Sequence, residues 1–364
     1  MNEDTITTQN IFYVVIQLHC AQRKEKIIFM RIWFNHWFST AYNLIKQLKD
    51  TDNTLTIIGS SYKDFMPYNI LCDEWYKEPT DELTYIDWCI NFCKEKKIDI
   101  FIPRTKRILI SKEYRRFEEI GVKVMVDDNY ELIETLEDKI KTMELCKQYN
   151  ICNTPEICVV TNIDEFKEKY NYLKSKYHDE DICMKYAKDE GGLSFRIIRE
   201  GLEDINSLKE YQGSQIIYDR AVQILKSENS FNPIILMVYM TGPEVSIDSL
   251  MTKKGFIGCA RIKEKSKITK IDVNSPLIKV SENFAKITNI KRPYNMQFMY
   301  HNNTAYLLEV NTRMAGGTYK SGLAGINFPY LAYSELANID FELPTDIKNV
   351  TLTTMESPII IERK

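Results

Sequence analysis

The chain has 364 residues, 44% of which are hydrophobic, and a formal net charge of −3 at pH 7. A chain of this length can bury more than one hydrophobic core, so we expect two or three domains or subdomains. The small negative charge argues against a protein that binds nucleic acid, because such proteins usually show a concentrated basic excess.

The first residues and the cysteines bear on where the protein works. Residues 11–20 are apolar but too few to cross a bilayer, and the acidic flank before them does not fit a signal peptide, so we expect no membrane anchor. This leader is either an extra strand or a poorly ordered extension. The nine cysteines are scattered and odd in number, which is not typical of a disulfide framework. We therefore expect reduced thiols and a cytoplasmic protein.

Strand and helix patterns alternate between residues 27 and 126. The expected strands are residues 27–34, 55–58, 98–102 and 122–126, and the expected helices are residues 40–48, 85–94 and 112–120. Such alternation with short connections predicts a doubly wound parallel sheet, with pockets beyond the carboxyl ends of its strands. We assign residues 1–130 to this N-terminal α/β domain.

A dinucleotide-binding oxidoreductase is one alternative for this domain. However, the loop after the first expected strand, residues 35–39, contains no glycine. A pyrophosphate therefore cannot approach the backbone through the usual glycine turn. The domain fits better as one that helps to form a substrate pocket.

A helix and a glycine loop follow. Residues 137–155 begin with Glu-Asp-Lys and place apolar residues at helical spacing before Pro155. Residues 182–198 have the pattern of a strand, a Gly191-Gly192 loop and a second strand. Backbone N–H groups in such a loop can bind phosphate oxygens, and a lysine at the end of the first strand adds a point charge. The acidic pair at residues 189–190 would repel an anion if it faced inward.

The most informative stretch is residues 295–317, because it places oxygen ligands at strand spacing. Glu309 and Asn311 project to the same face, and Arg313 follows two residues later. The run at residues 295–300 predicts the other strand of a hairpin. A three-residue loop at residues 302–304 would pair His301 with Ala305 and place Gln297 opposite Glu309, whereas a four-residue loop would break this cluster. Carboxylate and amide oxygens suit Mg²⁺.

This stretch resembles the metal-binding end of the ATP-grasp superfamily, in particular the large subunit of carbamoyl phosphate synthetase and related carboxylate-amine ligases. The matching residues are Gln297, the run Leu308-Glu309-Val310-Asn311-Thr312-Arg313, and Gly316-Gly317. The resemblance implies that Glu309 bridges two Mg²⁺ ions and that Gln297 and Asn311 each help to hold one. It also implies that Arg313 contacts phosphate or acyl phosphate. Mn²⁺ is the alternative metal.

Three other segments match in the family's order, so the resemblance covers residues 120–335. It implies that Lys139, at the start of a helix, and Lys185 grip the nucleotide phosphates. The other implied nucleotide contacts are Gly191, Gly192 and Ser194 in a mobile lid, Met237 and Tyr239 in a hinge whose backbone meets adenine, and Glu244 on the ribose. The family's usual hinge acid is replaced by Met237 or Val238, so adenine recognition depends on backbone atoms.

The resemblance implies an ATP-grasp domain at residues 131–364, α+β in its C-terminal part, with a lid subdomain at about 155–236. The implied enzyme is a ligase that uses ATP to form an acyl phosphate, with Arg313 and Lys185 as its catalytic residues. Its partners are small-molecule carboxylate and amine substrates, without nucleic acid or membrane, and a homodimer is left open. The candidate substrate-binding residues are Arg261, Lys263, Arg313, Gly316, Gly317 and Lys320.

An ATP-binding regulatory or assembly protein with this fold and little turnover is the second hypothesis. The acidic pair in the lid loop and the missing hinge acid favour it. The single set of motifs argues against a complete carbamoyl phosphate synthetase, which carries two sets.

Overall fold

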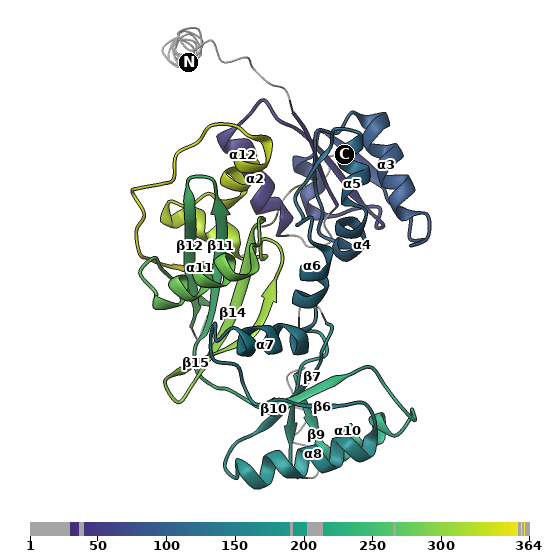
Figure 1. Ribbon diagram of the computed structural model, residues 1–364, viewed down its shortest axis with the longest axis vertical. Helices are drawn as coiled ribbons and strands as arrows, with labels where there is room; N and C mark the ends of the chain where they lie inside the picture. Colours follow the sequence, from purple (N-terminus) through teal and green to yellow (C-terminus); the bar gives the residue numbers. More distant parts are fainter. Residues whose placement is uncertain are drawn as a thin grey trace.

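The computed structural model describes residues 30–35, 40–189, 192–201, 214–264, 267–355, 358 and 360. The described residues form three sheets of five, five and six strands. Figure 1 shows the N-terminal sheet at the upper right, the six-stranded sheet beside it, and the remaining sheet at the bottom of the molecule. Among the described residues, no helix is long and apolar enough to cross a membrane.

The N-terminal sheet is parallel and has the strand order β3-β2-β1-β4-β5. Its strands are β1 (Arg31–Phe34), β2 (Thr56–Ser61), β3 (Glu74–Lys77), β4 (Ile100–Ile102) and β5 (Lys123–Val124). Successive residues of β1 enter different cores, since Ile32 and Phe34 lie in one and Trp33 in the other. Both faces of the sheet are therefore covered, as a parallel sheet requires. The predicted α/β class is confirmed.

Helices cover the two faces of this sheet. Helix α2 (Ala41–Thr51) and the late helix α12 (Phe328–Ala337) pack in one core. Helices α3 (Tyr85–Lys96), α4 (Arg107–Lys112) and α5 (Tyr114–Glu119) pack in the other. The helix predicted at residues 112–120 is confirmed as α5, which begins two residues later because Glu113, with φ of −99° and ψ of 18°, separates it from α4. A short 3₁₀ helix, η1 (Pro67–Leu71), precedes β3. The leader at residues 11–20 and the first three residues of the first predicted strand lie outside the described residues.

Two helices connect this domain to the rest of the chain. They are α6 (Tyr130–Leu136) and α7 (Lys139–Gln148). Asp138 caps α7, because its Oδ1 accepts hydrogen bonds from the backbone N–H groups of Ile140 (2.9 Å) and Lys141 (3.3 Å). A cap of this kind stabilises a helix by about 1 kcal/mol. The cap also makes Lys139 the first residue of the helix, which lies next to the last strand of the predicted hairpin.

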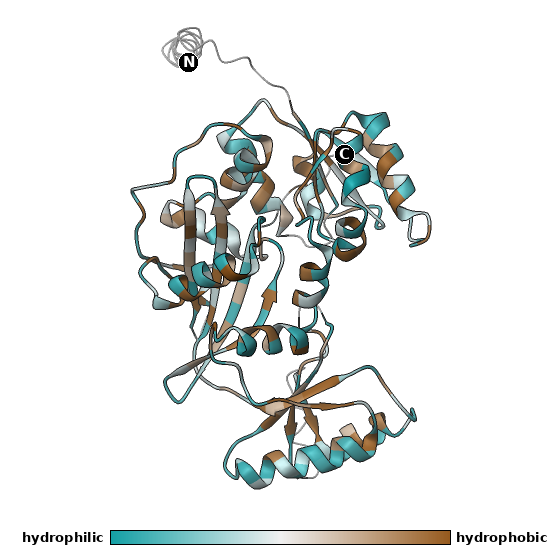
Figure 2. Ribbon diagram, viewed as in Figure 1, coloured by the Kyte–Doolittle hydropathy of each residue, from teal (hydrophilic) through white to brown (hydrophobic). Residues whose placement is uncertain are grey.

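The second sheet is a separate layer with the order β6-β10-β7-β8-β9. Its strands are β6 (Cys158–Val160), β7 (Ile182–Tyr186), β8 (Arg196–Arg199), β9 (Gln215–Ile217) and β10 (Ile234–Val238). Helices α8 (Ile163–Lys176) and α10 (Tyr218–Leu225) share one core with it. Figure 2 shows the strands coloured mainly as hydrophobic and α8 mainly as hydrophilic, as expected for a helix that buries one stripe only.

The third sheet is antiparallel, with the order β15-β14-β11-β12-β13-β16. Its strands are β11 (Glu244–Thr252), β12 (Gly255–Lys263), β13 (Ile268–Asp272), β14 (Tyr294–His301), β15 (Thr304–Asn311) and β16 (Val350–Thr353). Helix α11 (Pro276–Thr288) packs on one face. The other face meets the N-terminal domain through a core that also contains residues of η2 (Thr318–Ala324) and α12.

The turn of the β14–β15 hairpin is shorter than predicted. His301 pairs with Thr304, so the turn is Asn302-Asn303, with φ of +48° and +62°. Two residues of positive φ are typical of a type I′ turn. Neither the three-residue loop nor the four-residue loop considered from the sequence is therefore present.

The predicted pairing of Gln297 with Glu309 is nevertheless confirmed. Phe298 pairs with Leu307, so the ladder shifts by one residue between Gln297 and Phe298 and leaves Leu308 as the extra residue of a bulge. The turn is one residue shorter than the loop that would pair Gln297 with Glu309 in an unbroken ladder, and the bulge of one residue restores this pairing.

Candidate functional site

The hairpin gathers three oxygen-bearing side chains on one face of the third sheet. Gln297 lies opposite Glu309, and Asn311 follows on the same strand. The Nδ2 of Asn311 donates to Oε1 of Glu309 at 2.9 Å, so the amide oxygen of Asn311 is the atom left to accept other bonds. The side chain of Glu309 is 24% exposed. One carboxylate and two amides provide the hard oxygen donors that Mg²⁺ and Mn²⁺ prefer.

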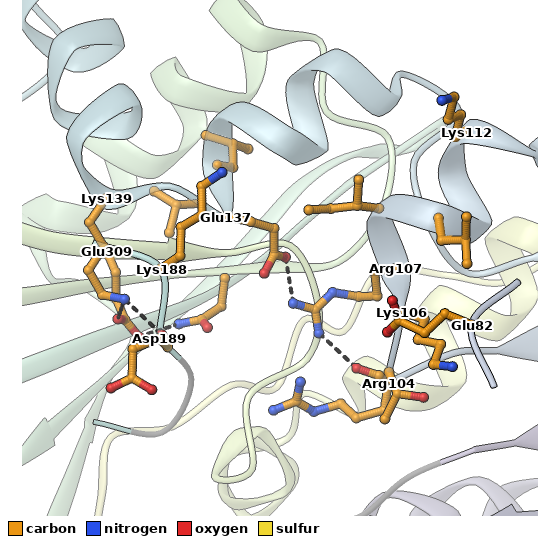
Figure 3. A pocket seen from close by; sticks show the side chains of 16 residues that line it. Glu82, Arg104, Lys106, Arg107, Lys112, Glu137, Lys139, Lys188, Asp189 and Glu309 are labelled. Atoms are coloured by element: carbon orange, nitrogen blue, oxygen red, sulfur yellow. Dashed lines mark hydrogen bonds and ion pairs between the residues drawn. The ribbon is translucent and has the colours of Figure 1, made fainter. Parts of the chain in front are cut away.

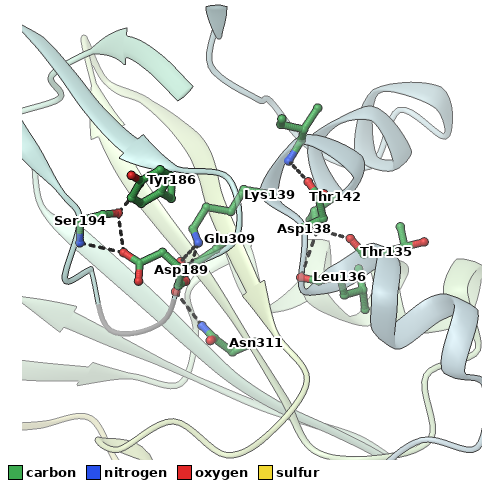
Figure 4. A network of polar contacts seen from close by, with 11 residues as sticks. Thr135, Leu136, Asp138, Lys139, Thr142, Tyr186, Asp189, Ser194, Glu309 and Asn311 are labelled. Atoms are coloured by element: carbon green, nitrogen blue, oxygen red, sulfur yellow. Dashed lines mark hydrogen bonds and ion pairs between the residues drawn. The ribbon is translucent and has the colours of Figure 1, made fainter. Parts of the chain in front are cut away.

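Lys139 joins three segments at this cluster. Its Nζ donates to the backbone oxygen of Asp189 at 2.8 Å and lies 3.5 Å from Oε2 of Glu309. Figure 4 shows the lysine between α7, β15 and the loop that contains Asp189, which we call the lid loop. The side chain is 7% exposed, so its positive charge is held at a fixed place beside the carboxylate.

The carboxylate of the lid loop is engaged by the loop itself. Asp189 Oδ2 accepts hydrogen bonds from the backbone N–H (2.8 Å) and the hydroxyl (2.5 Å) of Ser194. The Ser194 hydroxyl in turn accepts from the backbone N–H of Tyr186 at 2.9 Å (Figure 4). The negative charge of Asp189 is therefore partly compensated, and Ser194 braces the loop. Gly192 has a φ of +67°, while Gly191 and the second acid of the predicted pair lie outside the described residues.

Lys185 is a buried cation on β7. It forms no hydrogen bond with the described residues, and only 9% of it is exposed. Burial lowers its pKa, Glu309 raises it, and Lys139 lowers it further, with a net lowering. A buried ammonium next to a second lysine is suited to an anionic ligand, because such a ligand would favour its charged form.

The predicted hinge packs against the hairpin. Met237 and Met240 form a small apolar cluster with Cys183, and Tyr239 and Met299 pack on it. The backbone N–H of Tyr239 donates to Asp181 O at 2.7 Å, so this donor is already used next to the second sheet.

The end of the hinge touches β14 and β12. A Cβ on Gly242 would lie 2.3 Å from Tyr300 O, so only glycine fits there. Glu244, the predicted ribose ligand, accepts a hydrogen bond from Lys263 Nζ at 3.0 Å. The structure thus pairs two residues for which the sequence predicts different ligands.

Asp248 is a second polar centre on the same face of the sheet. Its two oxygens accept five hydrogen bonds of 2.6 to 3.0 Å, from Arg261 Nε and Nη2, Asn295, Thr318 and Ser321. The carboxylate is 1% exposed and holds the guanidinium of Arg261 in place. The sequence alone indicates no role for Asp248, although its position four residues after Glu244 on an alternating strand places both on one face.

The remaining predicted substrate residues lie around Arg261. A Cβ on Gly317 would lie 2.4 Å from Arg261 Nη1, so glycine lets the arginine pass close to the backbone. Lys320 donates to Thr269 at 3.1 Å. Burial lowers the pKa of Lys320, and the charges of Arg261 and Lys263 lower it further, which shows that the three cations lie near one another. Gly316 lies against Thr40 of the N-terminal domain.

Arg313 follows the end of strand β15 by two residues. Its Nη1 is 3.5 Å from Met314 O, and the side chain lines a narrow pocket together with Arg104. Its charge also acts on Glu137, which accepts hydrogen bonds from Arg107 (2.5 Å) and Thr312 (2.8 Å). Burial alone would raise the pKa of Glu137, but these cations and hydrogen bonds lower it.

A cavity of about 650 Å³ connects the hairpin cluster with the N-terminal domain (Figure 3). Its lining comes from the segment after β4, the junction of α6 and α7, the lid loop and β15. Glu309 and Lys139 are at one end, and Asn311, which also lines the cavity, is bonded to Glu309 there. The expected position of a pocket beyond the carboxyl ends of the parallel strands is confirmed. The lining does not include Arg261, Lys263, Arg313, Gly316, Gly317 or Lys320.

Comparisons with known proteins agree with this geometry. A family model described as ATP-grasp in the biosynthetic pathway with Ter operon matches residues 230–358. The carbamoyl phosphate synthase large chain of Clostridium acetobutylicum is 24% identical over 251 residues, which are 64% of this chain and 21% of that protein. The chain thus spans about a fifth of this curated relative's length.

Solved structures show the same fold. An ADP complex of PurK, an N5-carboxyaminoimidazole ribonucleotide synthetase, has a TM-score of 0.65 at 10% identity, covering 90% of this chain and 82% of that one. The biotin carboxylase domain of Hydrogenobacter thermophilus 2-oxoglutarate carboxylase, in complex with MgADP, ADP and bicarbonate, has a TM-score of 0.60 at 16% identity, covering 89% and 73%. An L-amino acid ligase from Bacillus licheniformis has a TM-score of 0.57 at 15% identity, covering 87% and 75%. The chain has the ATP-grasp fold, and its residues 230–358 match an ATP-grasp family model.

The ATP-grasp fold explains why these segments meet. Strand β7 of the second sheet carries Lys185, and the loop that follows it meets Lys139 at Asp189. Helix α7 places Lys139 beside Glu309 of the hairpin. Among the described residues, no group of three His, Cys, Asp or Glu side chains is arranged to hold a metal. The candidate metal site of this ATP-grasp chain instead combines Glu309 with the amides of Gln297 and Asn311.

Proposed function

We propose that the protein is an ATP-dependent ligase that activates a carboxylate as an acyl phosphate and joins it to an amine or similar nucleophile, releasing ADP and phosphate. One observation carries the proposal. Glu309, flanked by Gln297 and Asn311, lies beside the buried cation Lys139 at one end of a cavity that is large enough for a substrate, and its charge also acts on the buried Lys185.

This arrangement addresses the main difficulty of the reaction, which is charge. Moving the terminal phosphoryl group of ATP onto a carboxylate brings anions together, so positive charge must be fixed where they meet. Gln297, Glu309 and Asn311 would hold Mg²⁺ or Mn²⁺, and the metal would neutralise phosphate oxygens. Lys139 and Lys185 would bind the phosphates from the other side, and their burial strengthens the attraction.

The second group of cations is proposed to serve the acceptor and the transferred phosphoryl group. Arg261 is held rigidly by Asp248 and passes close to Gly317, so it presents its charge at a fixed position. Arg313 follows the metal-binding strand and would stabilise the acyl phosphate. The carboxylate oxygen attacks the phosphorus, ADP leaves, and the amine then displaces phosphate, so no covalent bond to the protein is needed.

The structural relatives support this direction. Two of them are named for joining or activating small carboxylates, as an L-amino acid ligase and an N5-carboxyaminoimidazole ribonucleotide synthetase. We accordingly propose small-molecule carboxylate and amine substrates and a cytoplasmic enzyme.

An ATP-binding regulatory or assembly protein with little turnover is the second candidate. The observation that favours it is the engaged N–H of Tyr239, which is already bonded to Asp181 O and leaves the hinge one donor fewer for adenine. Such a protein would bind ATP without consuming it.

The test is acceptor-dependent turnover. The protein is incubated with ATP, Mg²⁺ and pooled amino acids and other carboxylates, and ADP and phosphate are measured with and without the pool. We expect release with the pool only, reduced about 100-fold in Lys139→Met. Lys141→Met is the matched variant, because Lys141 lies on the same helix but is 48% exposed, and it should leave turnover unchanged. Nucleotide binding without acceptor-dependent release would favour the regulatory protein instead.

A further inference from the structure

The end of the cavity away from Glu309 is formed by residues 104–107, which follow β4. This segment lies where the strand order of the parallel sheet reverses, between β1 and β4. Ligands of doubly wound sheets bind at this point, beyond the carboxyl ends of the strands. Sequence analysis singles out no residue here.

The segment is held in a defined shape by Asn35, the residue after β1. The Oδ1 of Asn35 accepts from the backbone N–H of Arg104 at 2.7 Å. Its Nδ2 donates to Thr105 Oγ1 at 3.1 Å and to Tyr85 Oη at 2.8 Å. Asn35 is 2% exposed, so these three hydrogen bonds lie in the protein interior.

Lys106 has two unusual features. Its φ is +54°, in the left-handed region that non-glycine residues rarely adopt. Its Nζ is buried and has no hydrogen-bond partner among the described residues. The ammonium lies 4.1 Å from the centroid of the Tyr85 ring, a cation–π contact that leaves its N–H donors unused. A strained backbone and an unsatisfied buried cation at one residue together point to a function.

The buried acid Glu78, on which the charge of Lys106 acts, does not satisfy this lysine. Glu78 accepts hydrogen bonds from Ser60 Oγ at 2.7 Å and from Tyr85 Oη at 2.9 Å, and none from Lys106. Burial raises the pKa of Glu78, and the charge of Lys106 lowers it in part. Lys106 therefore influences Glu78 through space, and its Nζ has no hydrogen-bond partner in the part of the chain that the structure describes.

The surrounding charges favour an anion. The basic residues lining this end are Arg104, Lys106, Arg107 and Lys112 (Figure 3). The acids are Glu82, which is exposed to solvent, and Glu137, which is bonded to Arg107. Ile108, Leu109 and Leu136 line the cavity as well and provide apolar surface.

We propose that residues 104–107, with Lys106 as the central donor, bind a second anionic group of the acceptor. This proposal rests on the proposed ligase function and deepens it. The reacting carboxylate would lie near Glu309 and Asn311, an apolar part of the molecule would contact Ile108 and Leu136, and the second anion would take the donors of Lys106. The acceptor is therefore a carboxylate with a further carboxylate or phosphate at its other end.

The experiment measures anion binding to the full chain. The protein is first saturated with a non-hydrolysable ATP analogue and Mg²⁺, which occupy the proposed nucleotide site, and is then titrated by calorimetry with succinate, inorganic phosphate or acetate. We expect succinate or phosphate to bind more tightly than acetate. A preference for succinate identifies a second carboxylate, and one for phosphate identifies a phosphate group.

Variants assign the binding to Lys106. Lys106→Met should weaken it about tenfold or more, because a charge-assisted hydrogen bond is lost, whereas Lys106→Arg should retain it. Lys63→Met is the matched variant, since Lys63 is an exposed lysine that also lies over a tyrosine ring, at 5.7 Å, and it should bind as the unmodified protein does. Thermal unfolding checks that each variant is folded.

Two results would overturn the proposal. One is that neither succinate nor phosphate binds. The other is that Lys106→Met binds them as tightly as the unmodified protein while unfolding more easily, which would make Lys106 only a counter-charge for Glu78. If the ATP analogue itself fails to bind, the ligase function fails, and the same titrations on the nucleotide-free protein still decide the role of Lys106.

Discussion

Asp248 and Glu309 are two carboxylates on the same face of one sheet, but they differ in exposure and in the number of hydrogen bonds that they accept. Asp248 is 1% exposed and accepts five hydrogen bonds from the protein. Glu309 is 24% exposed, accepts one hydrogen bond from Asn311, and has Lys139 at 3.5 Å.

The difference separates a carboxylate that builds the site from one that has capacity for a ligand. All the acceptor capacity of Asp248 is used to fix Arg261 and the η2 segment, so it can take no metal. Among the described residues, Glu309 accepts a hydrogen bond from Asn311 alone, so it keeps acceptor positions beside two amides and two lysines. A saturated buried acid thus marks structure, and an unsaturated acid at the edge of a cavity marks binding.

The largest effect on stability is expected for Asp248→Asn. The amide cannot compensate the buried guanidinium of Arg261, and breaking a buried ion pair costs about 3–5 kcal/mol. Urea unfolding measures the loss. Asp50→Asn, which removes an exposed i,i+4 partner of Lys46, should cost less than about 0.5 kcal/mol. A loss below about 1 kcal/mol for Asp248→Asn would remove the distinction between the two carboxylates.

Gly317→Ala should act on turnover. The new Cβ would lie 2.4 Å from Arg261 Nη1, so the guanidinium must move although Asp248 holds it. We expect acceptor-dependent turnover to fall about 10- to 100-fold, because small displacements of a positioning group are costly. Nucleotide affinity, measured separately, should stay the same. An equal loss in both would place Arg261 at the nucleotide and not at the acceptor.

Lys185→Met should change how stability depends on pH. Burial lowers the folded-state pKa of Lys185 below its ordinary 10.5, so between these two values the unfolded chain binds more protons and the stability of the unmodified protein rises with pH. The variant should be about 1 kcal/mol more stable near neutral pH, with the gap closing towards pH 10.5. Denaturant unfolding at several pH values measures this.

The exposed Lys188→Met provides the comparison for that experiment. Lys188 lies in the loop that follows β7, its side chain is 60% exposed, and its ion pair with Asp138 is long at 3.8 Å, so Lys188→Met should change stability by less than about 0.5 kcal/mol and leave its pH dependence unchanged. If Lys185→Met is destabilised at every pH, the lysine is a structural residue and the contrast with a ligand-binding cation is lost.

The smallest effect is expected at the hairpin turn. Asn303 has a φ of +62°, and the second position of a type I′ turn favours glycine. Asn303→Gly should therefore raise the free energy of unfolding by about 0.5 kcal/mol without altering nucleotide binding. A larger change, or an altered nucleotide affinity, would show that the register of Gln297 and Glu309 depends on this turn and not on the bulge.

The sequence predicts those features that depend on local patterns. Alternation identifies the parallel sheet, but the edge strand β3 is missed because its residues are only half-buried and give a weak pattern. The pairing of Gln297 with Glu309 is predicted correctly although the loop is not, since a bulge depends on packing that one strand does not reveal. The assigned domain boundaries and the roles of the individual site residues stay predictions.

Asp248 and Lys106 show why part of the site cannot be found from the sequence. The partners of Asp248 lie 13 to 73 residues away along the chain. Lys106 is distinguished by its backbone φ and by the absence of a hydrogen-bond partner among the described residues. Neither property leaves a local pattern, because both arise only when distant segments pack together.

The central claim is that the Glu309 cluster binds a metal-nucleotide complex. Calorimetry with a non-hydrolysable ATP analogue, with and without Mg²⁺, tests it in the unmodified protein and in Glu309→Gln. We expect Mg²⁺ to strengthen binding in the unmodified protein, and Glu309→Gln to lose about 100-fold in this Mg²⁺-dependent affinity while its unfolding free energy changes by less than about 1 kcal/mol. Binding that is independent of Mg²⁺, or equal in the two proteins, would contradict the claim.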